Sequence, residues 1–470
     1  MIILRRILFY IFFLVYLFIC PLIILYAFGY ILKPNSEKAM IKTGLISLSS
    51  VPYGANVYIE NKHYLNNTPA VIRDLIPGNY SVSLNLKDYQ PAWRVISVVA
   101  GKASVFEHTL LLPKKWNIRV LLPDSFETLM PLAGTHFILL SRGSRLKDYM
   151  VYNWRRETAW PLLEAGSELN NAKVLSCSQV KLIGDKEEFI RFELRDKAVK
   201  VDDLSRFFYK IPQSVKWDPQ VPENMFVLED NHLNRIDVTG NGLSPKYIEG
   251  VYGYAISDKM IYIFNQNDAI TQIDYEKKKS EVIYDNAKSD VTSFNHQSDS
   301  IIEPLSKESV IFCPERGALF LNLGNRRLLE KKLQGIEFDP ESKRLAAWQE
   351  GKIGVLELLK KESGDSVKIY APHLAWIFSE GKSITQCFWV YRGTHLMFLD
   401  SDKVYLLGVE GELNLNIAEL FEVKKNSAIF YNGQEGRLYF LDRATGSFSS
   451  AQVIPEKEKN EIPLFTPNPG

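Results

Sequence analysis

Paired carboxylates are the first residues of this 470-residue chain to consider, because two acids held together can do acid–base chemistry. Glu187-Glu188 and Asp202-Asp203 each place two acids side by side in the sequence. Adjacent side chains of an extended chain face opposite ways, so neither pair converges on one substrate. The chain also lacks the His-Glu-x-x-His, Gly-x-x-x-x-Gly-Lys and Gly-x-Ser-x-Gly motifs. We therefore predict no catalytic residues and a protein that is not an enzyme.

A second candidate for chemistry is Asp400-Ser401-Asp402, which starts like a calcium-binding loop. Such a loop needs glycine at its sixth place and glutamate at its twelfth, where this chain has Tyr405 and Gly411. A hairpin turn is therefore the better interpretation. The seven histidines are scattered, and no two of them stand at metal-ligand spacing with a cysteine or a carboxylate. The sequence predicts no metal site and no cofactor.

The cysteines do not form a disulfide framework. Cys177, Cys313 and Cys387 are spread widely, each within an apolar strand-like run, which is typical of buried free thiols. The sequence does not decide whether any two of them pair. Cys20 ends Leu17-Phe18-Ile19-Cys20, which is similar to a lipobox, but Ile19 is too bulky for that site. A plain cysteine within the membrane is the interpretation we adopt.

Residues 7–32 form an N-terminal run without a charged residue. As a helix the run would cover roughly 39 Å, which exceeds the roughly 30 Å hydrocarbon core of a bilayer. We predict one transmembrane helix over residues 7–32, tilted or kinked at Pro21, with residues 1–6 in the cytoplasm. The alternative is a cleaved signal peptide, for which Ala27-Phe28-Gly29 is the one weak cleavage site. Both interpretations send residues 35–470 across the membrane.

The composition beyond this run bounds the remaining possibilities. Basic and acidic residues nearly cancel, at 56 against 55, so the electrostatic footprint of a nucleic-acid-binding protein is absent. Aromatic residues make up 12% of the chain, which favours a β-rich fold. The length leaves room for about two to three domains.

Residues 41–112 read as short alternating strands separated by turn residues. The turns are marked by glycine and proline, and the residues that carry the pattern are Pro52, Gly54, Ala55, Thr68, Pro69, Pro77, Gly78, Tyr80 and Tyr89. Asn66-Asn67-Thr68 is a formal glycosylation sequon, but the turn before Thr68-Pro69 explains the same residues.

The order of these landmarks resembles the PEGA domain, a small β-sandwich of bacterial surface proteins. Pro52-Tyr53-Gly54-Ala55 stands where that family carries Pro-Glu-Gly-Ala, so Tyr53 replaces the acidic residue. Asp88 replaces the glycine of the family's Gly-Tyr turn. The resemblance implies structural roles for the motif residues and a spacer or wall-contact role for the module. It implies no catalysis.

From residue 115 to residue 455 the chain repeats short apolar strands joined by polar turns. Equivalent points recur at roughly 35–50 residues, which suits the four-stranded blade of a β-propeller. We predict a propeller with about seven or eight blades, the rival being a row of β-sandwich domains. Trp217-Asp218-Pro219 and Phe338-Asp339-Pro340 each precede a strand pair and resemble the blade starts of TolB-like and WD40-like proteins. Residues 456–470 read as a disordered tail.

Six tryptophans of this region could stack on sugars, but we expect them to fill the cores of the blades. They are Trp154, Trp160, Trp217, Trp348, Trp376 and Trp389.

The sequence thus predicts an all-β ectodomain behind one N-terminal transmembrane helix, with a PEGA-like β-sandwich followed by a propeller. We expect a single-pass protein of the cell membrane whose N-terminus lies inside and whose bulk is extracytoplasmic. The expected role is a non-catalytic binding or scaffold protein of the bacterial envelope, with a cell-wall or envelope-protein partner and no nucleic acid. One alternative is a membrane-tethered, propeller-type hydrolase or lyase acting on glycans. Another is assistance in envelope-protein assembly, as TolB-like proteins give to larger complexes.

Overall fold

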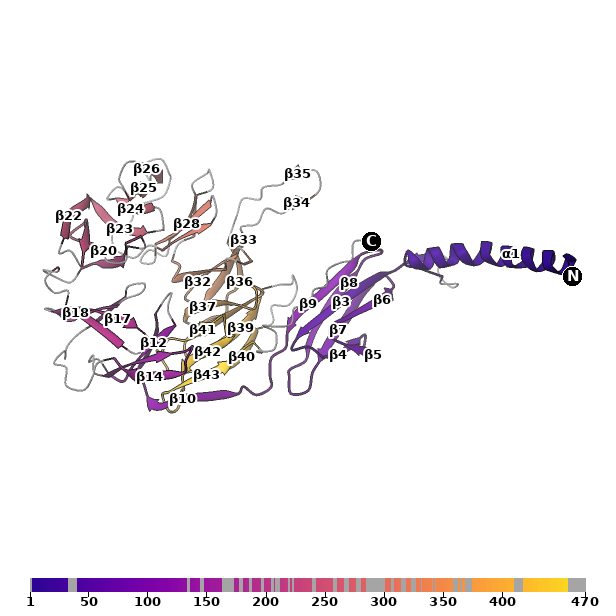
Figure 1. The fold of residues 1–470 in the computed structure, drawn as a ribbon, viewed down its shortest axis with the longest axis horizontal. Coiled ribbons are helices and arrows are strands. Elements are labelled where there is room, and N and C mark those ends of the chain that lie inside the picture. Colours follow the sequence, from indigo (N-terminus) through magenta and orange to yellow (C-terminus); the bar gives the residue numbers. More distant parts are fainter. Residues whose placement is uncertain are drawn as a thin grey trace. The chain divides into compact units, whose positions relative to one another are not determined.

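Figure 1 shows the fold of the chain, a computed structural model. The structure describes residues 2–32, 40–132, 136–143, 148–162, 173–176, 181–185, 188–195, 198–203, 207, 212–218, 220–221, 224–238, 242–256, 260–265, 270–275, 280–284, 301–305, 308–313, 318–322, 327–330, 332–339, 341–342, 344–357, 362–363, 366–367, 374–409 and 417–454. The predicted tail at 456–470 lies outside these residues.

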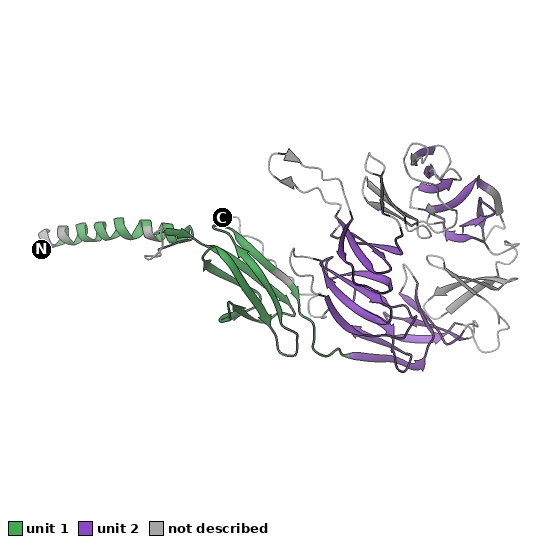
Figure 2. Cartoon of the chain, turned by 180° about the vertical axis from the view of Figure 1, so that it is seen from behind, with its two compact units in different colours: residues 1–117, 452–470 green, residues 118–451 purple. Residues whose placement is uncertain are grey.

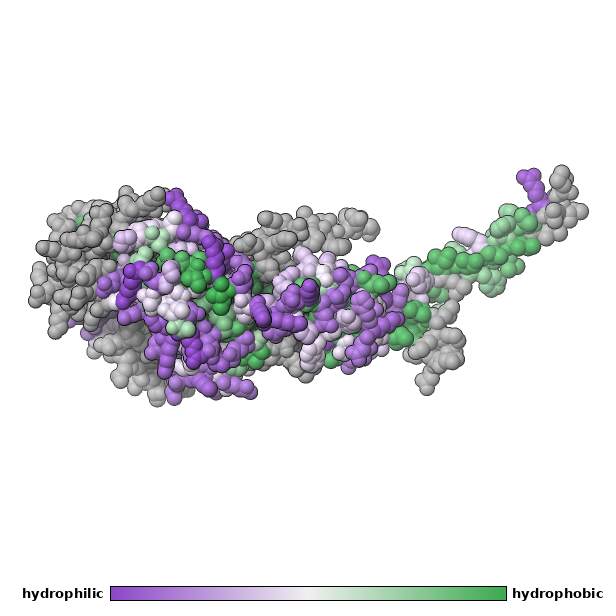
Figure 3. All heavy atoms as spheres, turned by 90° about the horizontal axis from the view of Figure 1, so that it is seen from below, coloured by the Kyte–Doolittle hydropathy of each residue, from purple (hydrophilic) through white to green (hydrophobic). Residues whose placement is uncertain are grey.

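The N-terminal helix α1 spans Ile2–Ala27 and contains Pro21. Its segment Leu8–Ala27 is long and apolar enough to cross a membrane, and its side chains are exposed along an almost continuous hydrophobic surface (Figure 3). The helix ends at Ala27, inside the predicted span of residues 7–32. Gly29 adopts a φ of 79°, a left-handed conformation that ends helices. Strand β1 (Tyr30–Leu32) then pairs with β2 (Met40–Lys42).

The chain divides into two compact units (Figure 2). One contains residues 1–117 with 452–470, and the other contains residues 118–451. The sequence placed the corresponding domains at 41–112 and 115–455. Every described element after α1 is a β-strand, which confirms the expectation of a mostly β chain.

The first unit contains two sheets that enclose one core. The sheets are β5 (Lys62–Asn67), β4 (Asn56–Ile59), β7 (Gly78–Asn85) and β8 (Ala92–Val98), in that order, and β6 (Ala70–Leu75), β3 (Gly44–Val51) and β9 (Ala103–Leu110). Strands β3 and β9 run parallel, whereas the other pairs are antiparallel. Apolar residues alternate along the strands and meet in the core, which includes Ile46, Leu48, Val57, Ile59, Val82, Leu84, Ile96 and Val98.

The second unit has eight four-stranded antiparallel sheets among its described residues. In strand order they are β10 (Ile118–Ser125), β43 (Ser447–Gln452), β42 (Arg437–Leu441) and β41 (Phe430–Asn432); β11 (Thr128–Pro131), β12 (Phe137–Ser141), β13 (Tyr149–Asn153) and β14 (Thr158–Pro161); β15 (Lys173–Ser176), β16 (Lys181–Asp185), β17 (Glu188–Arg195) and β18 (Ala198–Asp203); β19 (Ser214–Trp217), β20 (Asn224–Glu229), β21 (His232–Asp237) and β22 (Gly242–Glu249); β23 (Val251–Ile256), β24 (Met260–Asn265), β25 (Ile270–Asp274) and β26 (Ser280–Tyr284); β27 (Ile301–Leu305), β28 (Glu308–Cys313), β29 (Ala318–Asn322) and β30 (Arg327–Glu330); β31 (Gly335–Asp339), β32 (Arg344–Gln349), β33 (Lys352–Glu357) and β36 (Ala375–Phe378); and β37 (Ile384–Val390), β38 (His395–Asp400), β39 (Lys403–Gly408) and β40 (Ile417–Glu422). A small hairpin, β34 (Glu362–Ser363) with β35 (Ser366–Val367), lies between β33 and β36 in the sequence.

Six of these sheets are built from strands that directly follow one another along the chain, and the sheet of β31–β33 and β36 departs from this only by the hairpin between β33 and β36. The eighth sheet is different. The first strand of the unit, β10, pairs with β43 at its end, so the two ends of the unit share a sheet. Hydrophobic cores extend from one sheet into the next. Phe226 of β20 packs with Tyr254 of β23, and the Tyr254 hydroxyl donates to the Phe226 carbonyl at 2.7 Å. Trp348 and Trp389 likewise share a core between neighbouring sheets.

Candidate functional site

The PEGA-like motif joins the turn between β3 and β4 to the turn between β5 and β6 by backbone hydrogen bonds, an arrangement called the clasp below. The peptide bonds preceding Pro52 and Pro69 are cis, and Gly54 has a φ of 89°, which favours glycine. The Gly54 amide donates to the Thr68 carbonyl at 2.8 Å, and the Thr68 amide donates to the Ala55 carbonyl at 2.9 Å. The motif thus joins two turns that are adjacent in space.

The side chain of Thr68 completes this clasp from within. It is 3% exposed, and its hydroxyl accepts the amide of the fully buried Ala55 at 2.9 Å. The same hydroxyl lies 2.5 Å from the hydroxyl of Ser50, which also donates to the Pro52 carbonyl. These contacts satisfy buried polar groups within the turns, which is a structural task.

The remaining motif residues lie at turns around β7. Gly78 begins β7 directly after Pro77, and the Tyr80 hydroxyl donates to the Ile76 carbonyl at 2.8 Å. The Tyr89 amide donates to the Leu86 carbonyl at 3.1 Å, and its ring packs against the core of the sandwich. Asp88 has a φ of 68°, so it adopts a conformation for which the family's glycine is suited and which aspartate tolerates better than most residues.

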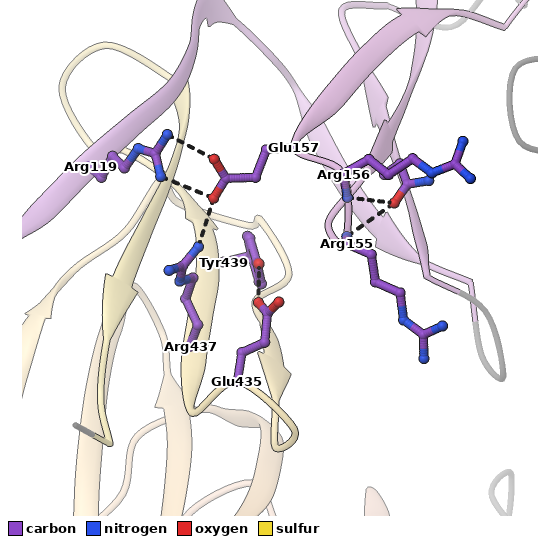
Figure 4. A network of polar contacts seen from close by, with 8 residues as sticks. Arg119, Arg155, Arg156, Glu157, Glu435, Arg437 and Tyr439 are labelled. Atoms are coloured by element: carbon purple, nitrogen blue, oxygen red, sulfur yellow. Dashed lines mark hydrogen bonds and ion pairs between the residues drawn. The ribbon is translucent and has the colours of Figure 1, made fainter. Parts of the chain in front are cut away.

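A second polar site joins the sheet that contains both ends of unit 2 to the sheet of β11–β14 (Figure 4). Glu157 lies in the turn between β13 and β14. Its carboxylate accepts two hydrogen bonds from Arg119 of β10, at 2.8 and 3.0 Å, and one from Arg437 of β42 at 3.0 Å. The network therefore connects two strands from opposite ends of the unit, β10 and β42, to the turn between β13 and β14.

Neighbouring contacts hold this turn in place. The Asn153 side-chain oxygen accepts the amides of Arg155 and Arg156 at 3.0 and 3.1 Å. Below the network, the Tyr439 hydroxyl donates to Glu435 at 2.9 Å. The Glu157 carboxylate is bound by Arg119 and Arg437, so the network links two sheets and has a structural role; it is called the Glu157 clamp below.

The electrostatics agree with that interpretation. Partial burial would raise the pKa of Glu157, but the hydrogen bonds from Arg119 and Arg437 outweigh it, so the pKa is lowered. Burial raises the pKa of Tyr152 to about 12 and also raises that of Tyr439. None of these shifts moves a group toward titration near neutral pH.

The acids of the aromatic-Asp-Pro segments lie at the turns between the first and second strands of their sheets. Asp218 is buried and accepts the amides of Gln220 and Val221 together with the guanidinium of Arg235 at 2.7 Å. Asp339 accepts the Ser342 amide at 2.9 Å. Both carboxylates stabilise turns.

Asp400 is the last residue of β38, directly before the predicted hairpin turn to β39, and accepts the amides of Lys382 and Ser383. No group of three or more His, Cys, Asp or Glu suited to a metal ion occurs among the described residues.

Of the other candidate residues, the tryptophans and one cysteine can be placed, whereas the paired acids and two cysteines cannot. Trp154, Trp217, Trp348 and Trp389 are buried, as expected for core residues, whereas Trp376 is 36% exposed and Trp160 is half-buried. Cys387 is a buried free thiol. Glu187 and Cys177 lie outside the described residues, and the side chains of Glu188, Asp202, Asp203 and Cys313 are likewise not described.

The comparisons with known proteins support the first unit most directly. The PEGA domain family matches residues 43–112, which confirms the resemblance expected at residues 41–112. No curated protein sequence matches the chain.

Two solved structures are similar to most of the chain. The β-propeller domain of Cps50 (Swd1) from Myceliophteria thermophila aligns with a TM-score of 0.40 and 10% identity, covering 72% of this chain and 99% of that one. BamB from Moraxella catarrhalis aligns with a TM-score of 0.41 and 11% identity, covering 72% and 96%. At such scores these likenesses carry no argument about function.

Sequence reasoning missed the Arg119–Glu157–Arg437 network. Glu157 and Arg437 are separated by 280 positions, and neither lies in a recognisable motif. Glu157 adopts a left-handed conformation, with a φ of 49°, but this local feature cannot be read from the sequence.

Proposed function

We propose that this chain is a membrane-anchored, non-catalytic binding or scaffold protein of the bacterial cell envelope. The observation that carries the proposal is the order of its parts. A helix able to cross a membrane is followed by a PEGA domain, and then by a unit made of repeated four-stranded sheets. In this proposal α1 inserts with its N-terminus inside, and the remainder of the chain lies outside.

The second unit would act as an eight-bladed propeller. Eight four-stranded sheets, and the pairing of β10 with β43, support this blade count, because propellers commonly close by joining their two ends in one blade. The Glu157 clamp would hold that closing blade against its neighbour. Such a rigid body presents loops on its faces, where a protein or glycan partner can bind.

The PEGA domain would act as a spacer or wall-contact element between the membrane and the propeller. Its motif residues form hydrogen bonds with backbone and side-chain groups of the same module, so they would stabilise the module, and binding would take place on its surface.

Crosslinking on intact cells tests the proposal. The full chain, carrying a C-terminal affinity tag, is treated with a membrane-impermeant crosslinker and purified under denaturing conditions. We expect a discrete crosslinked envelope partner or attached wall material. The matched control is Leu14→Arg together with Leu17→Arg, which interrupts the apolar span and should abolish these products. Absence of any crosslinked product from the wild-type chain would contradict the proposed role.

A further inference from the structure

The outer face of the sheet β5-β4-β7-β8 in the PEGA domain carries a row of rings and hydroxyls. Residues alternate between the two faces of a strand, and Val57, Ile59, Val82, Leu84, Ile96 and Val98 point into the core. The residues between them therefore lie on the opposite face, and they include Tyr58, Ser81, Ser83, Trp93, Val95 and Ser97.

Strand register brings four of these outer positions into one line. His63 pairs with Tyr58, Tyr58 with Ser83, and Ser83 with Trp93, so the row crosses all four strands. The rings of Tyr58 and His63 lie 5.0 Å apart. Trp93, at the far end, is 53% exposed, an unusual position for a tryptophan in a folded domain. Tyr58 and Trp93 are two strands apart, which corresponds to roughly 10 Å.

The polar groups of this row are available to a ligand. The hydroxyls of Tyr58 and Ser83 and the indole N–H of Trp93 make no hydrogen bond to any other residue that the structure describes. Rings that combine an apolar face with a polar edge suit ligands that are apolar on one side and rich in hydroxyls around their rim. Sugar rings have this character.

The charges of the face favour a neutral ligand. The outer positions of β4, β7 and β8 carry no lysine or arginine. The carboxylate of Glu60, at the end of β4, accepts the Ser81 amide at 2.6 Å and is therefore occupied. Arg94 belongs to the inner alternation, where its guanidinium lies over the ring of Phe106. A polyanion would find no lysine or arginine along this row, whose one basic side chain is His63.

The outer face of the other sheet lacks these features. There the register aligns Val71, Ser47 and Val105 across β6, β3 and β9. Val105 is 58% exposed and Val71 43% exposed, yet this row contains no aromatic residue. The two faces of one module therefore offer a candidate site and an internal control of similar exposure.

We infer that the His63–Tyr58–Ser83–Trp93 row is a docking surface for a neutral, extended, β-1,4-linked glycan. The separation of Tyr58 from Trp93, roughly 10 Å, is close to the repeat of two sugar rings in such a chain, which suits a straight polymer. Both rings would stack on sugar faces while Ser83, between them, donates to a sugar hydroxyl. The inference rests on the proposed wall contact and assigns that contact to particular residues.

Co-sedimentation of the detergent-solubilised full chain tests the inference. The probes are insoluble chitin, which is β-1,4-linked N-acetylglucosamine, purified peptidoglycan sacculi, and starch granules, whose α-1,4 linkage curves the polymer. We expect the wild-type chain to pellet with chitin and sacculi and to remain in solution with starch. Trp93→Ala should weaken both interactions roughly tenfold, because it removes a large stacking surface. Trp93→Phe should retain most of the binding, and Val105→Ala should behave as the wild type.

The outcomes separate this inference from the function on which it rests. Pelleting of Trp93→Ala with sacculi as strongly as the wild type would overturn the docking row and leave the wall contact standing. Binding to starch as strong as binding to chitin would overturn the argument from polymer shape. If the wild-type chain pellets with neither chitin nor sacculi, both the docking row and the wall-contact role are overturned.

Discussion

Replacing Thr68 by valine should loosen the PEGA domain without changing its shape. Valine is close to threonine in shape but has no hydroxyl, so the buried amide of Ala55 loses its acceptor and Ser50 loses one partner. A buried donor left unsatisfied costs about 1–3 kcal/mol, so we expect a loss of about 2 kcal/mol in the stability of the module. Ser50 retains its bond to the Pro52 carbonyl, which limits the damage to one orphaned group.

Hydrogen–deuterium exchange of the full chain in detergent measures this loss locally, which a two-unit protein requires. A loss of about 2 kcal/mol corresponds to roughly thirtyfold faster exchange in peptides from β3, β4 and β7. Peptides from unit 2 should exchange as before. Thr68→Ser is the matched control, since it keeps the hydroxyl and loses a methyl group. If Thr68→Val and Thr68→Ser exchange at the same rate, the hydroxyl does not hold the clasp and the reasoning is refuted.

Three further predictions concern unit 2. Phe448 is fully buried against Tyr152 and Tyr439, so Phe448→Ala should destabilise the sheet of β10 and β41–β43 by about 3–5 kcal/mol, seen as faster hydrogen exchange in that sheet. The control Val282→Ala, at an exposed site, should have no such effect. Equal exchange in both variants would argue against a shared core. Asp218→Asn removes the charge facing Arg235 and should cost about 2–3 kcal/mol, seen as faster exchange in peptides from β19–β22, against little change for the exposed Asp230→Asn. Because the pKa of Glu157 is lowered in the folded state, its ion pairs contribute stability above the pKa of the unfolded state, and this stability is lost as pH falls through the folded pKa. Glu157→Gln should abolish this pH dependence, which is worth at most about 1 kcal/mol for so exposed a group. A pH profile of unfolding that is unchanged in Glu157→Gln would show that the carboxylate is not responsible.

The features that the sequence predicted well are those written in local patterns. The apolar run of α1, the alternation within β3 or β4, and the turn residues of the PEGA-like motif are each contained in a few consecutive positions. Strand pairs such as β20–β21 and β32–β33 likewise lie where short apolar runs joined by polar turns predicted them.

Features that depend on distant residues were not predictable in the same way. The end of α1 at Ala27 follows from the conformation of Gly29 and the pairing of β1 with β2, although the apolar run continues to Leu32. The Glu157 clamp requires β10 and β42 to be neighbours, which follows only from the joining of the two ends of unit 2. The docking row likewise emerges from register, because Tyr58 and Trp93 are brought into line by a strand between them.

The measurement that tests the central claim most directly is the side of the membrane on which the PEGA domain lies. Leu65 is 94% exposed, so Leu65→Cys in the full chain offers an accessible thiol, and the wild-type chain controls for labelling of the native cysteines. With a membrane-impermeant maleimide applied to intact cells, a membrane-anchored envelope protein predicts labelling of Leu65→Cys in the membrane fraction equal to that after permeabilisation. Labelling that appears only after permeabilisation, or a chain recovered in the soluble fraction, would contradict the account.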